Sequence, residues 1–570
     1  MTPADLVGGE WLGLRARGGL SGAAAPARAV AGITSRNPAH PDRIVWSGTP
    51  DSSHIDAAVS AARAALPTWS RWPRERRFAA LLRLKALYES RAQQIAELIS
   101  DETGKVLWDA RQEAGALAAK IDITLDDSAA GPLRRVTGFE FPLPGATGGL
   151  PASAPTRLGR CWFRPHGVMA VIGPFNFPAH LPNGHIIPAL AMGNTVILKP
   201  SDKAPAVGQL LIALMQEALE AEGAPPGVVN LIQGAGDIAA RLTTHAGIDG
   251  ILFTGSWPVG RRILEANLDN PGRIVALEMG GNNPAVVLPD ADLRQAVIEC
   301  LRSAFVSTGQ RCTCTRRVII HEAIAARFIP ALCKAASHLI IGHPRAEHPV
   351  FMGPIISEAS RTAVLDFQSR AAAAGAEVLV EASQPNRPLP SFDSSASAPS
   401  ALSAVNPPSD PQPEGWYISP GILRVDRFIP GDESNASAGE GFTVPTNGFH
   451  PGGDLEVFGP LLRLSVVPDL DEALNQANAT RFGLAASIFT RDPAAVDRFL
   501  AEARAGCINV NTGTAGASSK LPFGGLGRSG NHRPAGSFSL DYCAYPVAGM
   551  IESGAAAQLT PGMHFDDAWL

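Results

Sequence analysis

Cys312 is the residue with the clearest capacity for chemistry, and it stands in the run STGQRCTC at residues 307–314. A thiol becomes a strong nucleophile as its thiolate, and a thioester formed on it needs a base to activate the water that releases the product. Glu278, in LEMGGNNP at residues 277–284, is a candidate for that base. A lone cysteine is more often an inert core residue. The glycines near both residues let backbone approach a substrate closely, so the pair predicts covalent catalysis.

The second cysteine of that run, Cys314, is open to three interpretations. Two cysteines can be half of a metal site, but no other pair of cysteines or histidines has zinc-finger spacing relative to them, so we expect no metal. In an extended segment, residues two apart face the same side, which would allow Cys314 to be a resolving thiol or a disulfide partner. We favour the third interpretation, a small packing residue beside the nucleophile.

The composition predicts a large soluble enzyme. The 570 residues suggest several structural units, and the seven cysteines are odd in number and mostly scattered, as expected for free thiols in a reducing cytoplasm. The net charge is −5, so no excess of positive charge would attract nucleic acid or an anionic membrane. The first residues lack a signal-peptide pattern, and no charge-free apolar run reaches membrane length.

Apolar periodicity predicts the elements that must position these residues. Residues 55–66 and 74–98 have helical spacing, so we expect the N-terminal part to open with amphipathic helices. Four buried strands follow, with helical segments between them, and this alternation predicts a parallel α/β sheet. The strands are residues 168–173, 194–199, 228–232 and 250–254.

A turn with glycines at both ends, GSWPVG at residues 255–260, joins the last of these strands to a helical pattern. At a strand-to-helix turn, backbone N–H groups and the helix N-terminus can face a phosphate. The spacing differs from the usual dinucleotide fingerprint, and such a turn alone is a weak signal. Its place after a series of strands and helices favours nucleotide contact.

Two stretches have a composition unlike the rest. Residues 382–416 are rich in Ser, Pro and Asp, and residues 431–453 are rich in Gly, Ser and Asn. Such sequences bury too little apolar surface to offset the entropy of chain ordering, so we expect mobile surface insertions without chemistry. Residues 555–570 are expected to form a loosely held tail.

Seven motifs occur in the order of the aldehyde dehydrogenase superfamily, which the chain resembles over most of its length. They are NFP (176–178), KPS (199–201), FTGS (253–256), the run around Glu278, GQRC (309–312), EVFGP (456–460) and PFGG (522–525). The resemblance implies a fold of two parallel α/β domains plus a small β bridging element that builds a homodimer or homotetramer. It implies a nicotinamide cofactor domain at residues 8–138 and 167–277, a catalytic domain at 278–535, and a bridging element at 139–166 and 536–554.

The resemblance also implies the catalytic roles. Cys312 would attack an aldehyde to give a thiohemiacetal that passes hydride to the nicotinamide, and Glu278 would activate water against the resulting thioester. The Asn176 side-chain amide and the Cys312 N–H would hold the oxyanion, where each donor is worth about 3 kcal/mol. Taken alone, Asn176 would pass for a turn residue.

Cofactor contacts are implied in the same way. Lys199 and Glu456 resemble the residues that hydrogen-bond the ribose hydroxyls, and Phe458 resembles the residue near the nicotinamide ring. Asp202 stands where NAD-preferring relatives often carry glutamate, and a carboxylate there repels the 2′-phosphate of NADP. Because aspartate is one methylene shorter, NAD is favoured and NADP stays open. The phosphate turn would contribute Gly255, Ser256 and Gly260.

Within the superfamily, three segments most resemble the subfamily that oxidises N-succinylglutamate 5-semialdehyde in the arginine succinyltransferase pathway. These segments are residues 177–186, 309–314 and 529–546. The implied substrate is an anionic semialdehyde, and buried carboxylates need cationic partners. The candidate partners are His180, Arg311, His532 and Arg533, of which Arg533 is our first choice, although each is equally open to a structural role.

Other functions fit the same residues. The chain could instead oxidise a different semialdehyde or aldehydes in general, which a substrate panel would distinguish. A CoA-acylating enzyme is disfavoured because such relatives typically lack the hydrolytic base that Glu278 would provide. A catalytically silent binding or structural protein with this fold would have no need to keep Cys312, Glu278 and Asn176 together.

Overall fold

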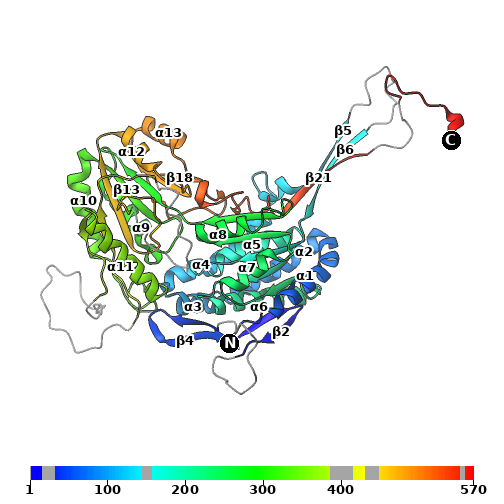
Figure 1. Cartoon of the computed structure of the whole chain (residues 1–570), viewed down its shortest axis with the longest axis horizontal. Helices are drawn as coiled ribbons and strands as arrows, with labels where there is room; N and C mark the ends of the chain where they lie inside the picture. The colour runs from blue at the N-terminus through cyan, green and yellow to red at the C-terminus, as the bar shows by residue number, and fades with distance from the viewer. Residues whose placement is uncertain (1, 16–31, 144–156, 386–414, 431–448, 552–558) are drawn as a thin grey trace.

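The computed structural model describes residues 2–15, 32–143, 157–385, 415–430, 449–551 and 559–570. Two α/β lobes lie side by side, and a narrow β arm leads away from one of them (Figure 1). Each lobe is built on its own seven-stranded sheet. We call them the first and second lobe in chain order.

The sheet of the first lobe has the strand order β11-β10-β7-β8-β9-β1-β2. Its first five strands pair in parallel, and β1 and β2 add an antiparallel edge. Every residue of β7 and β8 is buried, as expected for a parallel sheet with helices on both faces. The strands are β1 (Ala4–Val7), β2 (Glu10–Gly13), β7 (Val168–Ile172), β8 (Thr195–Lys199), β9 (Val229–Leu231), β10 (Gly250–Gly255) and β11 (Ile274–Met279).

The four strands expected from apolar runs are therefore β7, β8, β9 and β10. The expectation that helices open the chain was wrong, because β1, β2 and the pair β3 (Ile33–Asn37) and β4 (His40–Gly48) precede the first helix. β2 and β4 are largely exposed. They consequently lack the apolar pattern by which a strand is recognised in a sequence.

Helices α1 to α8 pack on the first lobe. The helical pattern at residues 74–98 is divided between two of them, because Arg91 (φ −107°, ψ 8°) leaves the helical conformation. The helices are α1 (Ser53–Arg71), α2 (Arg74–Ser90), α3 (Ala92–Thr103), α4 (Leu107–Thr124), α5 (His180–Ala191), α6 (Pro205–Ala221), α7 (Gly236–Thr244) and α8 (Trp257–Glu265).

The sheet of the second lobe has the order β14-β15-β16-β13-β12-β17-β18, and only β14 is antiparallel to its neighbour. The fold class, with two largely parallel α/β sheets, is thus confirmed. The strands are β12 (Asn283–Val287), β13 (Thr315–His321), β14 (Glu377–Val380), β15 (Gly421–Arg424), β16 (Leu461–Val467), β17 (Ala485–Phe489) and β18 (Cys507–Val510). The helices are α9 (Leu293–Phe305), α10 (Glu322–Ser337), α11 (Glu358–Ala373), α12 (Leu470–Ala477) and α13 (Pro493–Glu502).

The arm in Figure 1 is an antiparallel sheet of β5 (Phe139–Leu143), β6 (Arg157–Pro165) and β21 (Ala544–Ile551), in the order β21-β6-β5. Large apolar side chains on it are exposed, among them Phe139 and Met550. The arm falls within the segments expected to form a bridging element.

The segments predicted as insertions lie mostly outside the described residues, at 386–414 and 431–448. Of the predicted tail, residues 559–570 are described and exposed, with one 3-10 turn at Asp567–Trp569. In the ranges that the structure covers, no helix is long and apolar enough to cross a membrane.

Candidate active site

The turn that carries Cys312 begins where α9 ends at Phe305. Ser307, Thr308 and Gly309 then adopt left-handed backbone angles, with φ of 53°, 56° and 69°. These angles are unfavourable for Ser and Thr, and such strain persists only where the surroundings enforce it. The chain thus reverses just before Cys312, whose side chain is partly exposed.

Asp109, on α4, enforces this turn. Its Oδ2 accepts a hydrogen bond from Ser307 Oγ at 2.5 Å, and its Oδ1 forms an ion pair with Arg311 at 2.6 Å. Arg311 Nε also donates to Ser307 Oγ at 2.8 Å. Arg311 and Lys105 lower the pKa of Asp109 against the effect of its burial, so the carboxyl stays ionised. One buried carboxylate of the first lobe therefore binds two residues of the nucleophile turn.

Two asparagine amides hold the backbone on either side of the nucleophile. Asn176 Nδ2 donates to the Gln310 carbonyl at 2.9 Å, and Asn283 Nδ2 donates to the carbonyls of Cys312 at 2.8 Å and Cys314 at 2.9 Å. Asn176 follows β7 of the first lobe, whereas Asn283 begins β12 of the second. The turn is therefore fixed from both lobes, and the predicted oxyanion residue Asn176 lies beside it.

Glu278 lies on β11 and is 3% exposed. Burial raises the pKa of its carboxyl well above the usual value, and its buried Oε1 has no hydrogen-bond partner among the described residues. A side chain at Gly524, in the PFGG motif, would lie against that oxygen, so glycine there makes room for the carboxylate. A buried carboxylate that lacks partners is a stronger base than one in water.

Glu278 and Cys312 lie close enough to influence each other. Burial raises the pKa of the Cys312 thiol, and the negative charges of Glu278 and Glu456 raise it further. The thiol is therefore the resting form, and a base is needed to make the thiolate. Cys314 is fully buried and packs with Val306 and other apolar residues, as the packing interpretation predicted.

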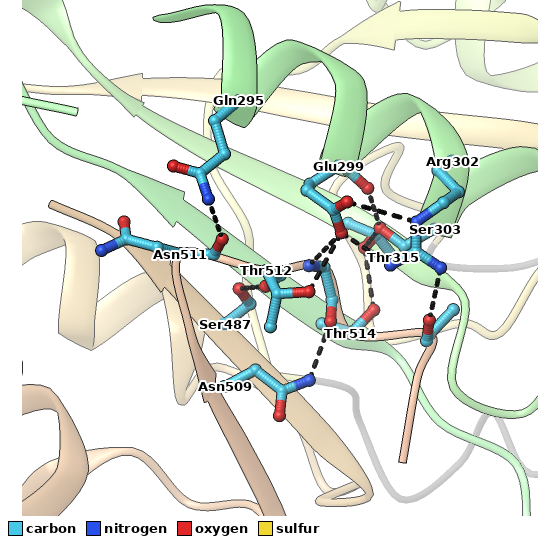
Figure 2. A network of polar contacts seen from close by, with 12 residues as sticks. Gln295, Glu299, Arg302, Ser303, Thr315, Ser487, Asn509, Asn511, Thr512 and Thr514 are labelled. Carbon is cyan, nitrogen blue, oxygen red and sulfur yellow. Dashed lines mark hydrogen bonds and ion pairs between the residues drawn. The ribbon is translucent and has the colours of Figure 1, made fainter. Parts of the chain in front are cut away.

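Figure 2 shows a polar network that fastens the segment after β18 to the strand that follows Cys312. Thr514 Oγ1 lies 2.6 Å from the Thr313 carbonyl and 2.8 Å from Thr315 Oγ1. Glu299, on α9, accepts a hydrogen bond from the N–H of Gly513 at 2.9 Å. Helix α9, the first residues of β13 and the segment after β18 are thereby joined next to the nucleophile.

The predicted phosphate turn joins β10 to α8. Gly255 ends the strand, and Ser256 precedes the helix without a side-chain capping bond, which leaves the first N–H groups of α8 for an anion. Gly260 lies so close to Met279 of β11 that any side chain there would collide with it. This close approach of helix to sheet is the packing that a dinucleotide-binding turn requires, so these residues fit a nicotinamide dinucleotide.

Lys199 ends β8 and is 5% exposed, and Asp202 lies partly exposed three residues later. Strands β8 and β10 both flank β7 in parallel. Their carboxyl ends therefore share one edge of the sheet, where ligands of such folds bind. Lys199 and Asp202 accordingly lie at the same edge as Gly255.

Glu456 and Phe458 lie beside segments that adjoin Glu278 and Asn176. The Glu456 carboxylate accepts a hydrogen bond from the Gly281 N–H at 3.0 Å, next to the strand of Glu278, and burial raises its pKa to about 7. The Phe458 ring meets Phe175 edge-on, with centroids 5.9 Å apart. Both residues thus adjoin segments that carry predicted catalytic residues.

The four predicted substrate partners fall into two places. Arg311 and His180 both contact Phe177, with the guanidinium 5.1 Å and the imidazole 6.3 Å from the ring centroid. His532 and Arg533 are exposed and adopt left-handed backbone, with φ of 56° and 48°. The structure therefore brings only Arg311 and His180 together.

Sequence reasoning missed residues that hold the nucleophile rather than react. Asn283 stood within a quoted motif without a role, and its place two residues after a pair of glycines was the available signal. Asp109 and Thr514 had no signal, because an acidic residue in a helix and a threonine in a loop are usually solvated.

Comparison with known proteins agrees with this geometry. The sequence pattern of the aldehyde dehydrogenase family matches residues 26–402 and 453–546. N-succinylglutamate 5-semialdehyde dehydrogenase 2 of Caulobacter vibrioides is 40% identical over 91% of this chain and 93% of its own length. The corresponding dehydrogenase of Hahella chejuensis is 38% identical over 91% of this chain and 93% of its own.

Solved structures show the same architecture. Lactaldehyde dehydrogenase from Escherichia coli superposes with a TM-score of 0.77 at 25% identity, over 96% of this chain and 99% of that one. NADP-dependent glyceraldehyde-3-phosphate dehydrogenase from Bacillus halodurans, complexed with NADP, gives 0.77 at 27% identity, over 97% and 99%. With sequence and structural relatives in agreement over nearly its full length, the chain belongs to the aldehyde dehydrogenase family, a family of oxidoreductases.

Proposed function

We propose that this enzyme oxidises N-succinylglutamate 5-semialdehyde to N-succinylglutamate with NAD, as a step of arginine catabolism through the succinyltransferase pathway. The observation that carries the proposal is the assembly of Cys312, Glu278 and Asn176 in one place. The names of the bacterial relatives at 37–40% identity support the choice of substrate.

The first step needs a nucleophile and an oxyanion site. The Cys312 sulfur attacks the aldehyde carbon, and the thiol proton is released to solvent water. Asn176 donates one N–H of its amide to the Gln310 carbonyl, so its second N–H is left for the developing oxyanion. The Cys312 backbone N–H is the other donor. The turn strained at Ser307 and Thr308 is held rigidly, which keeps these donors in place.

The bound nicotinamide would accept the hydride that leaves the tetrahedral carbon, which turns the adduct into a thioester on Cys312. The contacts proposed for it are Lys199 and Asp202 at the sheet edge, Gly255, Ser256 and Gly260 at the phosphate turn, and Glu456 and Phe458 nearer the nucleophile. Glu278 then takes a proton from water, the hydroxide attacks the thioester carbon, and the acid leaves as Cys312 recovers its proton.

The remaining features of the proposal follow the family resemblance. The division at residues 8–138, 139–166, 167–277, 278–535 and 536–554 into cofactor, bridging and catalytic parts is proposed with it. A homodimer or homotetramer in the cytoplasm is proposed as the working form, with the arm of β5, β6 and β21 at the subunit contact. Asp202 favours NAD over NADP, because its charge repels a 2′-phosphate.

NADH formation with a panel of aldehydes tests the proposal. We expect the highest kcat/KM with N-succinylglutamate 5-semialdehyde, and a lower value when NADP replaces NAD. Equal turnover of simple aldehydes would favour a general aldehyde dehydrogenase. Preference for another semialdehyde would overturn the substrate. No turnover of any aldehyde, with nicotinamide binding retained, would favour a silent binding protein.

A further inference from the structure

One face of α4 carries three ionisable side chains, one of which binds the turn of Cys312. Asp109, Glu113 and Lys120 are four and seven residues apart, a spacing that places them on one side of a helix. All three are buried. Asp109 binds the nucleophile turn, and Glu113 Oε1 accepts hydrogen bonds from the N–H groups of Ala179 and His180 at the start of α5. This face of α4 therefore lies along the segment that follows Asn176.

The charges on this face do not balance. Asp109 is paired with Arg311, and Glu113 with Lys105 at 2.5 Å. Lys120 is 3% exposed and has no carboxylate partner in the described part of the chain. Its ammonium donates to two neutral groups, the Gly536 carbonyl at 2.8 Å and Ser539 Oγ at 2.6 Å. An ammonium has three N–H groups, so one donor and one whole positive charge are left over.

An uncompensated buried charge is costly, and proteins usually pair it. The cost is visible here, because burial lowers the pKa of Lys120 to about 8. Neutral acceptors such as Gly536 and Ser539 orient an ammonium without cancelling its charge. A stabilising partner for Lys120 would therefore be an anion that is absent from the described residues.

His180 marks where that anion would lie. Its Nδ1 is buried and has no hydrogen-bond partner among the described residues. Burial, together with the smaller effects of the charges of Lys120 and Lys105, lowers the pKa of His180 to about 4. His180 is thus a neutral imidazole near two ammonium groups. It can donate a hydrogen bond to an acceptor that enters beside Phe177.

The next histidine of α5 provides an internal contrast. His185 is buried as well, but Nδ1 lies 2.7 Å from Tyr542 Oη and Nε2 lies 3.1 Å from Thr254 Oγ1. Both of its ring nitrogens are satisfied by the protein. A buried histidine of this helix can therefore be fully bonded in the fold, and His180 is not.

We propose that Lys120 and His180 form a subsite that binds a carboxylate group of the aldehyde substrate. The inference rests on the proposed function, since it gives the anionic semialdehyde a cationic partner beside the segment that follows Asn176. It differs from the sequence-based choice of Arg533, whose side chain is exposed. The pairs Arg311 with Asp109 and Lys105 with Glu113 involve the same face of α4 but are already neutral.

A matched pair of aldehydes isolates the contribution of the substrate carboxylate to kcat/KM. 5-Oxopentanoate and pentanal have the same chain length and differ in the terminal group, so the ratio of their kcat/KM values measures carboxylate recognition. We expect Lys120→Met to lower kcat/KM for 5-oxopentanoate by about a hundredfold and that for pentanal by less than about threefold. Lys120→Arg keeps the charge and should retain most of the preference.

Lys85→Met is the matched control. Lys85 lies on the neighbouring helix α2 and is paired with Asp122 at 2.8 Å, with 27% of its side chain exposed, so its loss should leave the ratio unchanged. His180→Phe tests the same subsite without removing a buried ammonium. It decides the question if Lys120→Met does not fold. Wild-type preference that survives in every soluble variant at these two positions would overturn the inference.

The wild-type enzyme separates the two proposals. Preference for 5-oxopentanoate without turnover of N-succinylglutamate 5-semialdehyde would overturn the proposed substrate and leave the subsite standing. Turnover of N-succinylglutamate 5-semialdehyde with an unchanged ratio in Lys120→Met and His180→Phe would overturn the subsite alone. Equal kcat/KM values for 5-oxopentanoate and pentanal in the wild type would also overturn the subsite.

Discussion

Asn283 binds the backbone of Cys312 directly. Its Nδ2 donates to the Cys312 carbonyl at 2.8 Å and to the Cys314 carbonyl at 2.9 Å, and its Oδ1 accepts from the Ala485 N–H at 3.0 Å. Every polar atom of this side chain is thus used, and the residue is 1% exposed. The nucleophile is therefore anchored to the sheet of the second lobe through a single amide.

We expect Asn283→Leu to lower kcat by at least about tenfold, because two carbonyls next to the nucleophile lose their donors and the Cys312 N–H is no longer aimed at the oxyanion. KM should change less than kcat, because Asn283 does not face the predicted substrate subsite. Steady-state kinetics check this, with Asn478→Leu as a control in which the donor that is lost bonds the Glu502 carbonyl and not the backbone of Cys312. Equal losses in both variants would contradict a positioning role.

The identity of the nucleophile is tested by the two cysteines of one turn. Cys312→Ala should abolish turnover without unfolding the protein, since the partly exposed thiol is lost and a small side chain still fits. Cys314→Ala should retain most activity at some cost in thermal stability, because Cys314 is fully buried. Kinetics with thermal unfolding distinguish them. An inactive Cys314→Ala beside an active Cys312→Ala would reverse the assignment.

Deacylation should accelerate as pH rises. Only the ionised Glu278 can accept a proton, and burial raises its pKa well above the usual value, so the base form appears at a higher pH than for an ordinary glutamate. Rapid mixing with excess aldehyde measures this step as the steady rate of NADH formation that follows the first turnover. In Glu278→Gln we expect a burst of NADH followed by a stall, with the acyl adduct on Cys312 visible by mass spectrometry. A stalled enzyme without that adduct would contradict the role.

The proposed reacting residues had a signal in the sequence and the residues that support them had none, for a physical reason. Cys312 and Glu278 belong to short motifs that contain glycines. Glycines of such motifs leave space for nearby groups, as Gly524 of the PFGG motif does for the Glu278 carboxylate. Asp109 and Lys120 act on residues far away in the chain, and their roles depend on the packing of α4 against other segments. A pattern of neighbouring residues carries no information about such contacts.

The elements of the fold also divide into those with a local sequence signal and those without one. Buried strands such as β7 and β8 can be predicted from continuous apolar runs in the sequence, because helices cover both faces of their sheet. The exposed strands β2 and β4 had no such pattern and were missed. Arg533, chosen from the sequence as an arginine within a motif, has an exposed side chain and lies with His532 in a left-handed turn that no local rule predicts.

The network in Figure 2 should affect activity through position alone. Thr514→Val removes the hydroxyl that bonds the Thr313 carbonyl at 2.6 Å while it keeps the side-chain shape. Loss of a buried hydrogen bond costs about 1–3 kcal/mol, so we expect a lower Tm together with a several-fold lower kcat. Thr514→Ser should restore both. A lower Tm with unchanged kcat would show that the network supports the fold without reaching Cys312.

Arg533 provides the last test, because its side chain and its backbone have different surroundings. The side chain is exposed, and solvent weakens any attraction between its guanidinium and a carboxylate. We therefore expect Arg533→Leu to lower kcat/KM for 5-oxopentanoate by no more than about tenfold, less than Lys120→Met does.

The Arg533 backbone lies against Gly524, which itself adjoins Glu278. A loss shared equally by 5-oxopentanoate and pentanal would mean that Arg533 supports the Glu278 environment. A loss of about a hundredfold on 5-oxopentanoate alone would instead establish Arg533 as the main carboxylate partner and require it to turn inward when substrate binds.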